Sequence, residues 1–566
     1  MEERRPQNAL NIEMVEEHRD NGQSAELETT RKRNKSSITQ NLLKSLNNFN
    51  LSLKEARERE TTPIEKIVWL VMFTSCFIYC GFLIWKSYSK WMRSPSIVML
   101  TENDQPIREI PFPAVTVCPE MKIMSTVFSF TEYMFNKTYR NLSETEQNMF
   151  EDVSLICNNF INHDVLEGRN YSFGNETVSN IRKASAELSQ VISMCTWKGK
   201  QSSCNNMFTP ILTEEGMCFT FNTIGPEDLF RYENLNADYE YMENLKRTKN
   251  QGWTLEYGYL PDAPRRTYPI RGSGAGPKAG MELLLTEDME GLDQECNDWL
   301  SGFKILLHTP SDLPRLSQQY IRVPIYQEVT IAFTATLEVT SDGLEVFTPF
   351  GRQCYFENER SLAYFKVYSQ SNCEYECLTN FTYARCGCVH FSMPHGPDMA
   401  ICNFGSLKCM SKAEMELSTM DIEDEGRGNV TIDEAIQIAD ACNCLPACTS
   451  ITYDTEVIQT ELHKDERDTL VFRNDSNGGH MAQSKVSEVV LYFKRPLFDI
   501  AKRSELYGTS DILASCGGLL GLFMGFSVIN IVEILYFCIL RFCRRNQADK
   551  CENSNNQTVQ QSKEKY

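Results

Sequence analysis

The sequence has 566 residues, more than one ordinary domain needs, so length predicts either several domains or one large core with appendages. A formal net charge of −20, without a basic stripe carrying interleaved aromatic residues, excludes nucleic-acid binding as a function. The hydrophobic fraction of 42% is ordinary, but the apolar residues are concentrated in two long runs near the two ends.

The first apolar run predicts a membrane-spanning helix. It extends from Ile67 to Trp85 without a charged residue, and at about 1.5 Å per residue it spans roughly 28 Å, the thickness of a hydrocarbon core. A cleaved signal peptide is disfavoured because a long, mostly polar segment precedes the run and basic residues follow it. We expect that preceding segment, residues 1–63, to be cytosolic and largely disordered.

The second apolar run, Ile512 to Leu540, is interrupted only by Glu533, and a basic cluster typical of a cytoplasmic flank follows it. Two crossings place both termini in the cytosol of a multi-pass plasma-membrane protein. The predicted order is a cytosolic segment (1–63), a first transmembrane helix (64–86), an extracellular domain (87–509), a second transmembrane helix (510–540) and a cytosolic tail (541–566).

The long middle segment has the features of an extracellular domain. Sixteen of the 22 cysteines lie there, an even number, as complete pairing requires. Period-two alternation predicts strands in 107–118, 320–340 and 485–495, and the 130–153 segment has a helical pattern. We therefore expect an α+β membrane protein with a disulfide-rich exterior. Seven glycosylation sequons are compatible with it: Asn136, Asn141, Asn170, Asn175, Asn380, Asn429 and Asn474.

Other chemistries are disfavoured by the motifs. The glycine-rich stretch 271–280 lacks the spacing of a phosphate-binding loop and is expected to be a plain loop. The CEYEC, CGC and CNCLPAC spacings resemble zinc ligands, but an oxidising exterior favours disulfides, so no metal and no cofactor are expected. No catalytic constellation occurs, so the chain is not expected to be an enzyme, and His390 is expected to be structural or on the surface.

The second apolar run contains more information than an anchor needs. Gly517, Gly521 and Gly525 recur every fourth residue, which gives one helix face almost no side-chain bulk. Such a face suits close helix packing, and it also suits an aqueous pore, which a two-helix chain can enclose only as about three or more copies. The run is longer than a hydrocarbon core, and a break at Gly525-Phe526-Ser527 would expose carbonyls able to coordinate a cation. Glu533 would then face water or another subunit, as a carboxylate at the inner mouth.

The sequence resembles the degenerin and epithelial sodium channel superfamily, which includes acid-sensing channels, and it looks closest to the insect pickpocket branch. The resemblance covers nearly everything from Pro63 to Arg545. It is carried by FPAVTVC at 112–118, GMCFTFN at 216–222, GFKILLHTPSDLP at 302–314, YSQSNCEYEC within the 354–448 cysteine block, and GGLLGLFMGFSVINIVEI. It implies a trimer whose extracellular domain has palm, finger, thumb, knuckle and β-ball regions.

The resemblance also implies how the extracellular cysteines pair. Cys157 and Cys296 are left over and are paired by exclusion. The other implied pairs are Cys118 with Cys218, Cys195 with Cys204, Cys354 with Cys448, Cys373 with Cys444, Cys377 with Cys442, Cys386 with Cys409, and Cys388 with Cys402.

By the same resemblance, the second helix carries the pore. Ala514 matches the position where bulky side chains hold the pore open, and Gly517 and Gly518 match the region of amiloride block. The implied pore-lining or gate residues are Ala514, Ser515, Gly517, Gly518 and Gly521, and the implied selectivity filter is Gly525, Phe526 and Ser527.

Two departures from the family pattern bear on conduction. The family's cytosolic His-Gly pair is missing, because no histidine lies between His18 and His163. Phe526 occupies the middle of the filter triplet, where a small residue is usual. These departures leave two readings open, a channel subunit that conducts by itself and an accessory subunit that needs a related partner.

The sequence thus predicts a subunit of an amiloride-sensitive, sodium-preferring, voltage-insensitive cation channel gated by an extracellular stimulus that it does not identify. Its expected partners are the sodium ion, the lipid bilayer, amiloride as a blocker, and related subunits in a homo- or heterotrimer. Two further alternatives are an ATP-gated trimeric channel, which would lack the quoted motifs, and a receptor or adhesion protein without conduction, against which the glycine face argues.

Overall fold

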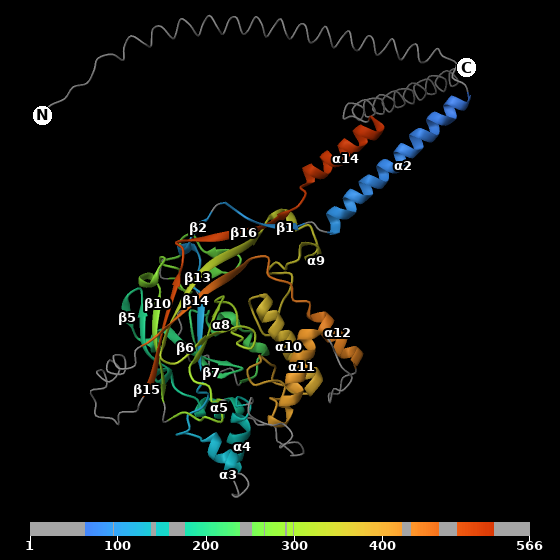
Figure 1. Ribbon diagram of the computed structural model, residues 1–566. Helices are drawn as coiled ribbons and strands as arrows, with labels where there is room; N and C mark the ends of the chain where they lie inside the picture. Colours follow the sequence, from blue (N-terminus) through green and yellow to red (C-terminus); the bar gives the residue numbers. More distant parts are fainter. Residues whose placement is uncertain are drawn as a thin grey trace, which may run out of the picture. The chain divides into compact units, whose positions relative to one another are not determined.

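The computed structural model describes residues 63–93, 96–102, 104–136, 143–157, 176–237, 252–264, 267–288, 291–297, 299–420, 432–462 and 484–525. The chain divides into two compact units (Figure 1). The first contains α2 as far as Tyr88 together with α14 from Asp511, and the second contains residues 89–510.

The helices differ in length and character. The two apolar helices of the first unit are α2 (Pro63–Arg93) and α14 (Thr509–Met524). The helices of the second unit are α3 (Phe130–Asn136), α4 (Glu144–Val153), α5 (Thr177–Ala184), α6 (Leu188–Val191), α7 (Cys204–Met207), α8 (Pro226–Leu229), α9 (Pro349–Arg352), α10 (Gln370–Cys386), α11 (Leu407–Thr419) and α12 (Ile432–Cys442).

The larger sheet of the second unit follows the order β1-β16-β13-β15-β10-β4-β5, with β14 added to β13 and β2 added to β16. Its longest pairing is the antiparallel β13–β14 ladder, from Gln327↔Glu461 to Glu338↔Ser450. The strands are β1 (Ser96–Leu100), β2 (Gln105–Pro106), β4 (Ile192–Trp197), β5 (Lys200–Ser202), β10 (Met281–Asp288), β13 (Gln327–Thr340), β14 (Ser450–Glu461), β15 (Ser484–Phe493) and β16 (Leu497–Glu505).

The smaller sheet has the order β12-β11-β3-β7-β6 and packs against the larger one. Its strands are β3 (Ala114–Pro119), β6 (Phe208–Thr213), β7 (Gly216–Phe221), β11 (Phe303–His308) and β12 (Ile321–Val323), and a separate hairpin joins β8 (Trp253–Thr254) to β9 (Gly258–Tyr259).

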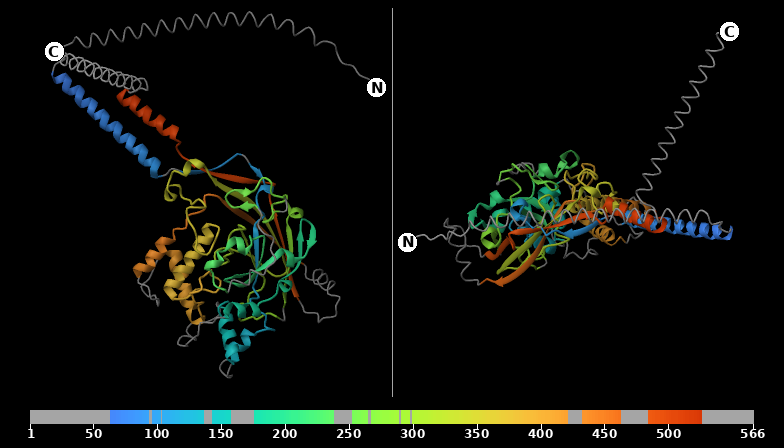
Figure 2. Two further views of the ribbon diagram at one scale, coloured as in Figure 1. Left: turned by 180° about the vertical axis from the view of Figure 1, so that it is seen from behind. Right: turned by 90° about the horizontal axis from the view of Figure 1, so that it is seen from above.

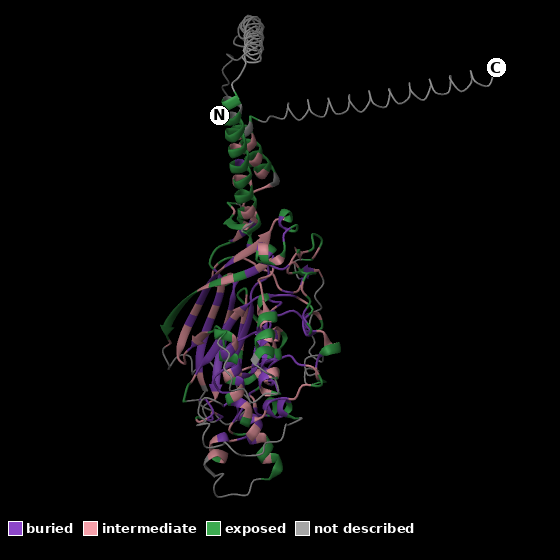
Figure 3. Ribbon diagram, turned by 90° about the vertical axis from the view of Figure 1, so that its right-hand side faces the viewer, coloured by how far each residue is buried: buried purple, intermediate pink, exposed green. Residues whose placement is uncertain are grey.

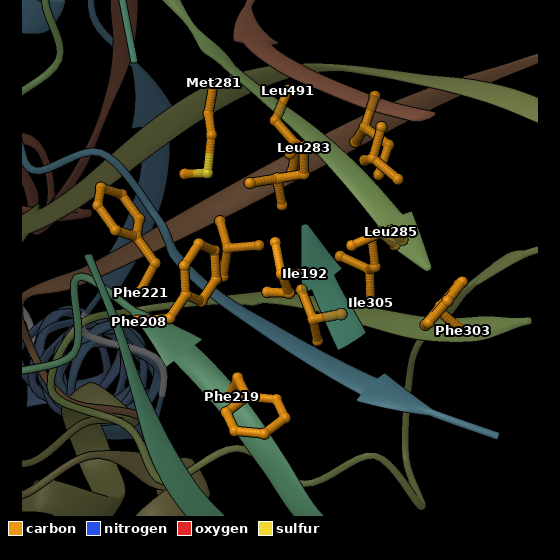
Figure 4. Close-up of a cluster of buried hydrophobic side chains, with 14 of the residues drawn as sticks. Ile192, Phe208, Phe219, Phe221, Met281, Leu283, Leu285, Phe303, Ile305 and Leu491 are labelled. Carbon is orange, nitrogen blue, oxygen red and sulfur yellow. The ribbon is translucent and has the colours of Figure 1, made fainter. Parts of the chain in front are cut away.

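The main hydrophobic core lies between these sheets (Figure 4). Met281, Leu283 and Leu285 alternate along β10 toward Phe219 of β7 and Ile305 of β11, and all five side chains are buried. Alternation with period two is what a strand with one face in the core requires. Figure 3 shows the same division, with buried residues concentrated in the sheets.

A helical layer formed by α10, α11 and α12 packs beside the sheets, on the side away from β5 in both the front and the rear view (Figures 1 and 2). Its helix α10 begins at an N-cap, Ser369, whose hydroxyl accepts the backbone N–H of Asn372, and it ends at Gly387 in the left-handed conformation. Turn chemistry therefore fixes both ends of the helix that carries Cys373, Cys377 and Cys386.

Most of the local sequence predictions are confirmed where the structure describes them. The expected strand segments 320–340 and 485–495 contain β12 with β13 and most of β15, and the 130–153 segment contains α3 and α4. The segment 107–118 is only partly a strand, because Ile107–Glu109 forms a 3-10 helix and β3 begins at Ala114. The stretch 271–280 is a loop with bridges at Arg271 and Ala275 and a short 3-10 helix at Pro277–Ala279. Its glycines have a packing reason, because a Cβ atom at Gly272 or Gly280 would collide with the backbone oxygen of Ile107 or Leu491.

Candidate functional site

Among the described side chains, α14 contacts α2 on the side that carries Phe523. The ring of Phe523 packs edge-to-face on Tyr79 of α2, with the centroids 5.6 Å apart. At about 100° per residue, Ala514, Gly517, Gly518 and Gly521 fall within an arc of roughly 100° on the opposite side of α14 from Phe523. The small residues therefore point away from α2.

Exposure along α14 follows the same division. All four residues of the small-residue face, Ala514, Gly517, Gly518 and Gly521, are exposed, as is Ser515 at its margin. On the side of Phe523 the side chains are half-buried, namely Ile512, Cys516, Leu519 and Leu520. A Cβ atom added to Gly517 or Gly518 would meet no atom within 4 Å. The small-residue face is thus open for another helix or for water.

The helix α14 ends at the first residue of the break that the sequence predicts. Its last residue is Met524, and Gly525 follows with φ +60°, in the left-handed region. The N–H of Gly525 donates to the carbonyl oxygen of Gly521 at 3.1 Å, which is the hydrogen bond of a left-handed C-cap. The other filter candidates, Phe526 and Ser527, and the carboxylate Glu533 lie outside the described residues.

The helix α2 is the longer of the two. Within the described residues, Leu70–Arg93 is the helical segment long and apolar enough to cross a membrane, and the apolar helix Ser510–Phe523 is shorter. The run from Ile512 to Leu540 continues outside the described residues. Most of the described side chains of α2 are exposed. Those that are not are Cys76, Cys80, Leu83, Ile84, Ser89 and Trp91, most of them at helical spacing.

The strands adjoining the two apolar helices in the chain are neighbours in the larger sheet. β1 follows α2 and β16 precedes α14, and they pair antiparallel from Ser96↔Glu505 to Leu100↔Ala501. β16 also runs parallel to β13, and Arg503 of β16 donates to Glu338 of β13 at 2.6 Å and 3.0 Å. Both strands that continue into the apolar helices are therefore held by hydrogen bonds within the larger sheet.

Sixteen described cysteines form eight disulfides, and these are the pairs given above from the family resemblance and, for Cys157–Cys296, by exclusion. Four of the bonds join cysteines that lie in the helical layer or in the loops next to it. Cys354–Cys448 lies where this layer meets β13 and β14. The bonds are Cys118–Cys218, Cys157–Cys296, Cys195–Cys204, Cys354–Cys448, Cys373–Cys444, Cys377–Cys442, Cys386–Cys409 and Cys388–Cys402.

A buried ion pair holds the helical layer together, and the cysteine pattern does not predict it. Arg385 of α10 donates from Nε and Nη2 to the two carboxylate oxygens of Glu416 of α11, both at 2.9 Å. The two side chains are only 6% and 2% exposed. Sequence reasoning missed this pair because the two residues are 31 positions apart on different helices.

A second charged cluster lies where β3, β7 and β11 meet. Glu215 accepts from Lys122 at 2.5 Å and from Lys304 at 2.7 Å. Burial alone would raise the pKa of the Glu215 carboxyl, but the two lysines outweigh it and lower the pKa to about 2. The carboxylate is therefore ionised at every physiological pH and acts as a structural link.

Two histidines, His308 and His390, have structural roles. His308 ends β11, with Nε2 2.9 Å from the Thr116 hydroxyl, and burial lowers its pKa to about 4. His390 Nδ1 lies 2.8 Å from the Ser392 hydroxyl, its ring is tilted by 37° to that of Phe391, and burial likewise lowers its pKa to about 4. Both rings are therefore neutral at pH 7.

The structure describes two of the seven asparagines that the sequence predicts as glycosylation sites. Asn380 is exposed on α10, and Asn136 is the last residue of α3. The remaining sequons, Asn141, Asn170, Asn175, Asn429 and Asn474, lie outside the described residues.

Two apolar helices, an open small-residue face on one of them, and a disulfide-rich domain in the chain between them are the features of a membrane channel subunit. The family model described as amiloride-sensitive sodium channel matches residues 51–537. The chain belongs to this family, and the resemblance stated from the sequence is confirmed. Members of the family are plasma-membrane cation channels, so the chain is a cation channel subunit and its α/β domain is extracellular. This membership decides against the ATP-gated alternative.

The sequence identity between this chain and individual relatives is low. Pickpocket protein 28 of Drosophila melanogaster is 26% identical over 508 residues, which cover 86% of this chain and 76% of that protein. The sodium channel protein Nach of the same species is 21% identical, over 88% and 86%. The human bile acid-sensitive ion channel is 20% identical, over 85% and 82%.

Proposed function

We propose that this chain is a subunit of a trimeric, sodium-preferring, voltage-insensitive and amiloride-sensitive channel in which α14 lines the ion path. The observation that carries the proposal is the direction of the small-residue face, which lies opposite the contact between Phe523 and Tyr79 and is exposed. Two helices enclose no aqueous path by themselves, so this face needs other copies around it.

Specific pore roles follow from that placement. The pore-lining and gate residues would be Ala514, Ser515, Gly517, Gly518 and Gly521, and amiloride would bind near Gly517 and Gly518. Gly525 would begin the filter formed with Phe526 and Ser527, since a left-handed residue ends the helical hydrogen-bonding pattern and leaves carbonyl oxygens free to face water or an ion. Glu533 would add a carboxylate at the inner mouth.

The remaining assignments complete the topology. Residues 1–63 and 541–566 would be cytosolic, 64–86 and 510–540 would cross the membrane, and 87–509 would be outside. The domain would divide into palm, finger, thumb, knuckle and β-ball regions, with α10, α11 and α12 in the thumb.

The test is voltage clamp of cells expressing the Ala514→Val form, with and without amiloride. The added methyl groups lie on the exposed face, so they have no packing partner within α14 or α2 and should instead crowd the copies around the axis. We expect a constitutive, amiloride-sensitive current at least tenfold above the wild-type resting current. The matched control is Leu519→Val on the α2 side, which should leave the resting current unchanged. Unchanged current in the Ala514→Val form, with normal surface expression and partner subunits present, would contradict the pore assignment.

A second candidate is an accessory subunit that conducts only with a related partner. The absence of histidine between His18 and His163 favours it, because the family's cytosolic His-Gly pair is then missing. Expression of the chain alone and together with related subunits separates the two readings. Surface trimers without current from the chain alone, and current on co-expression, would establish the accessory role.

A further inference from the structure

A cavity of about 190 Å³ lies in the extracellular domain where the β8–β9 hairpin meets the base of the helical layer. Five separate segments form it: the residues at the start of α8, the hairpin, the residues after Cys354, the residues before α10, and the residues around Cys448. No pore residue contributes to it. Its lining is Ile224, Asp228, Trp253, Thr254, Leu255, Glu256, Tyr355, Phe356, Glu357, Val367, Tyr368, Ala447, Cys448 and Thr449.

The inner part of the cavity is aromatic. Trp253, Tyr355 and Tyr368 belong to one buried hydrophobic cluster and are 3%, 9% and 5% exposed, and Phe356 adds a half-buried ring. Tyr355 and Tyr368 pack edge-to-face at 5.5 Å, and the Tyr368 hydroxyl donates to the carbonyl oxygen of Leu445 at 2.6 Å. The rings are therefore fixed before any ligand arrives.

The outer part of the cavity is acidic, while two guanidinium groups lie against aromatic rings of the lining, Arg352 4.4 Å from the ring centroid of Phe356 and Arg360 5.5 Å from that of Tyr355. The side chains of Glu256, on the hairpin turn, and Glu357 both line this part. Burial first, and then Glu357 and the charge of Glu345, raise the pKa of Glu256. Asp228 of α8 lines the same cavity. Within the described part of the chain, no lysine or arginine forms an ion pair with Glu256 or Glu357.

We propose that this cavity binds a small organic ammonium ion with an apolar body. The aromatic faces attract a cation and bury its carbon atoms, and the carboxylates accept charge-assisted hydrogen bonds from its N–H groups. A bound cation also removes the repulsion between Glu256 and Glu357. A bare metal ion would use the carboxylates but would gain nothing from the aromatic rings, so the combined lining favours an organic cation.

The site is placed to act on the rest of the domain. The N–H of Cys448 donates to the carbonyl oxygen of Tyr355 at 2.8 Å, and the Thr340 hydroxyl donates to the carbonyl oxygen of Cys448 at 2.7 Å. Thr340 ends β13, the strand that pairs with β16. A ligand held between Glu256 of the hairpin and Glu357 would thus brace the base of the helical layer against the larger sheet. This inference goes beyond the proposed pore function and does not depend on it.

The test is equilibrium binding of radiolabelled phenethylammonium to the purified full-length protein at pH 7.4, without any measurement of current. We expect saturable binding that becomes roughly tenfold weaker in Glu256→Gln and in Glu357→Gln, since each removes a charge-assisted hydrogen bond. The matched control Glu227→Gln, one position from Asp228 but outside the cavity lining, should bind as the wild type does. Binding should also weaken as the pH falls, because protonation of Glu256 removes the charge that attracts the ammonium.

Two further probe molecules test separately how the charge and the aromatic ring of the ligand contribute to its binding. 2-Phenylethanol, which has the same ring but no charge, and methylammonium, which has the charge but no ring, should each bind at least tenfold more weakly than phenethylammonium. Equal binding of either probe, an unchanged affinity in both glutamine variants, or the absence of saturable binding would overturn the proposal. Thermal melting of both variants checks the fold, and loss of one of two neighbouring carboxyls should leave the melting temperature unchanged or higher.

Discussion

Replacement of Arg385 by methionine tests whether the buried ion pair holds the helical layer together. In the wild type, two hydrogen bonds of 2.9 Å join Arg385 of α10 to Glu416 of α11, and water reaches almost none of either side chain. The substitution leaves the Glu416 carboxylate buried, and among the described residues its remaining ion-pair partner is Lys412, at 4.0 Å. The helix contacts themselves are largely preserved because methionine is long and apolar.

The expected loss follows from that geometry. Removing one partner of a buried pair costs about 3–5 kcal/mol, and we take about 3 kcal/mol because Lys412 partly neutralises Glu416. At 1.4 kcal/mol per factor of ten, local opening of α11 becomes roughly a hundredfold more frequent. The double variant Arg385→Met with Glu416→Leu should recover most of the loss, because it leaves no unpaired charge.

Hydrogen exchange measured by mass spectrometry on peptides from α11 is the appropriate assay. Exchange should accelerate in Arg385→Met and return toward the wild-type rate in the double variant. Lys494→Met is the matched control, because its pair with Glu456 is exposed, with side chains 48% and 64% accessible, and should contribute about 0–1 kcal/mol. If Arg385→Met and Lys494→Met have the same small effect, the reasoning about the buried pair is wrong.

Two further predictions concern stability. The pKa of His308 is 6.5 in the unfolded chain and about 4 in the folded protein, so the unfolded state binds more protons between these values. The free energy of unfolding should therefore decrease by up to about 3 kcal/mol as the pH falls from 6.5 to 4. On acidification, the melting temperature should fall less in His308→Gln than in the wild type, and an equal fall in both forms would contradict this. Replacing Cys354 and Cys448 by alanine should cost about 3.5 kcal/mol, because the nested bridges shorten the loop that the bond closes to about 23 residues; an unchanged melting temperature would contradict this.

Much of the fold was accessible from the sequence because its signals are local or tied to a family pattern. Period-two alternation gave β13 and β15, and the recurrence of Gly517, Gly521 and Gly525 gave a small-residue face and its end. The cysteine pairs followed from motif position, which carries long-range information that spacing alone does not contain.

The rest depends on contacts between distant segments. The pair of Arg385 with Glu416 joins two helices whose order in space no local pattern encodes. The cavity around Trp253 and Glu256 arises because a hairpin folds onto residues one hundred and more positions away, beside Cys354 and Cys448. The direction of the small-residue face relative to α2 required the contact between Phe523 and Tyr79, because a helical periodicity identifies a face but not the neighbour it turns away from.

The most direct test of the central claim, that the small-residue face of α14 lines the ion path, is modification of single cysteines by a charged methanethiosulfonate reagent during current recording. Cysteine at Gly518 should be modified and the current should change by more than half, whereas cysteine at Leu519, on the α2 side, should be unaffected. The native Cys516 lies on that same side, so wild-type current should be insensitive to the reagent. Modification of the Leu519→Cys form, with the Gly518→Cys form unaffected, would contradict the account.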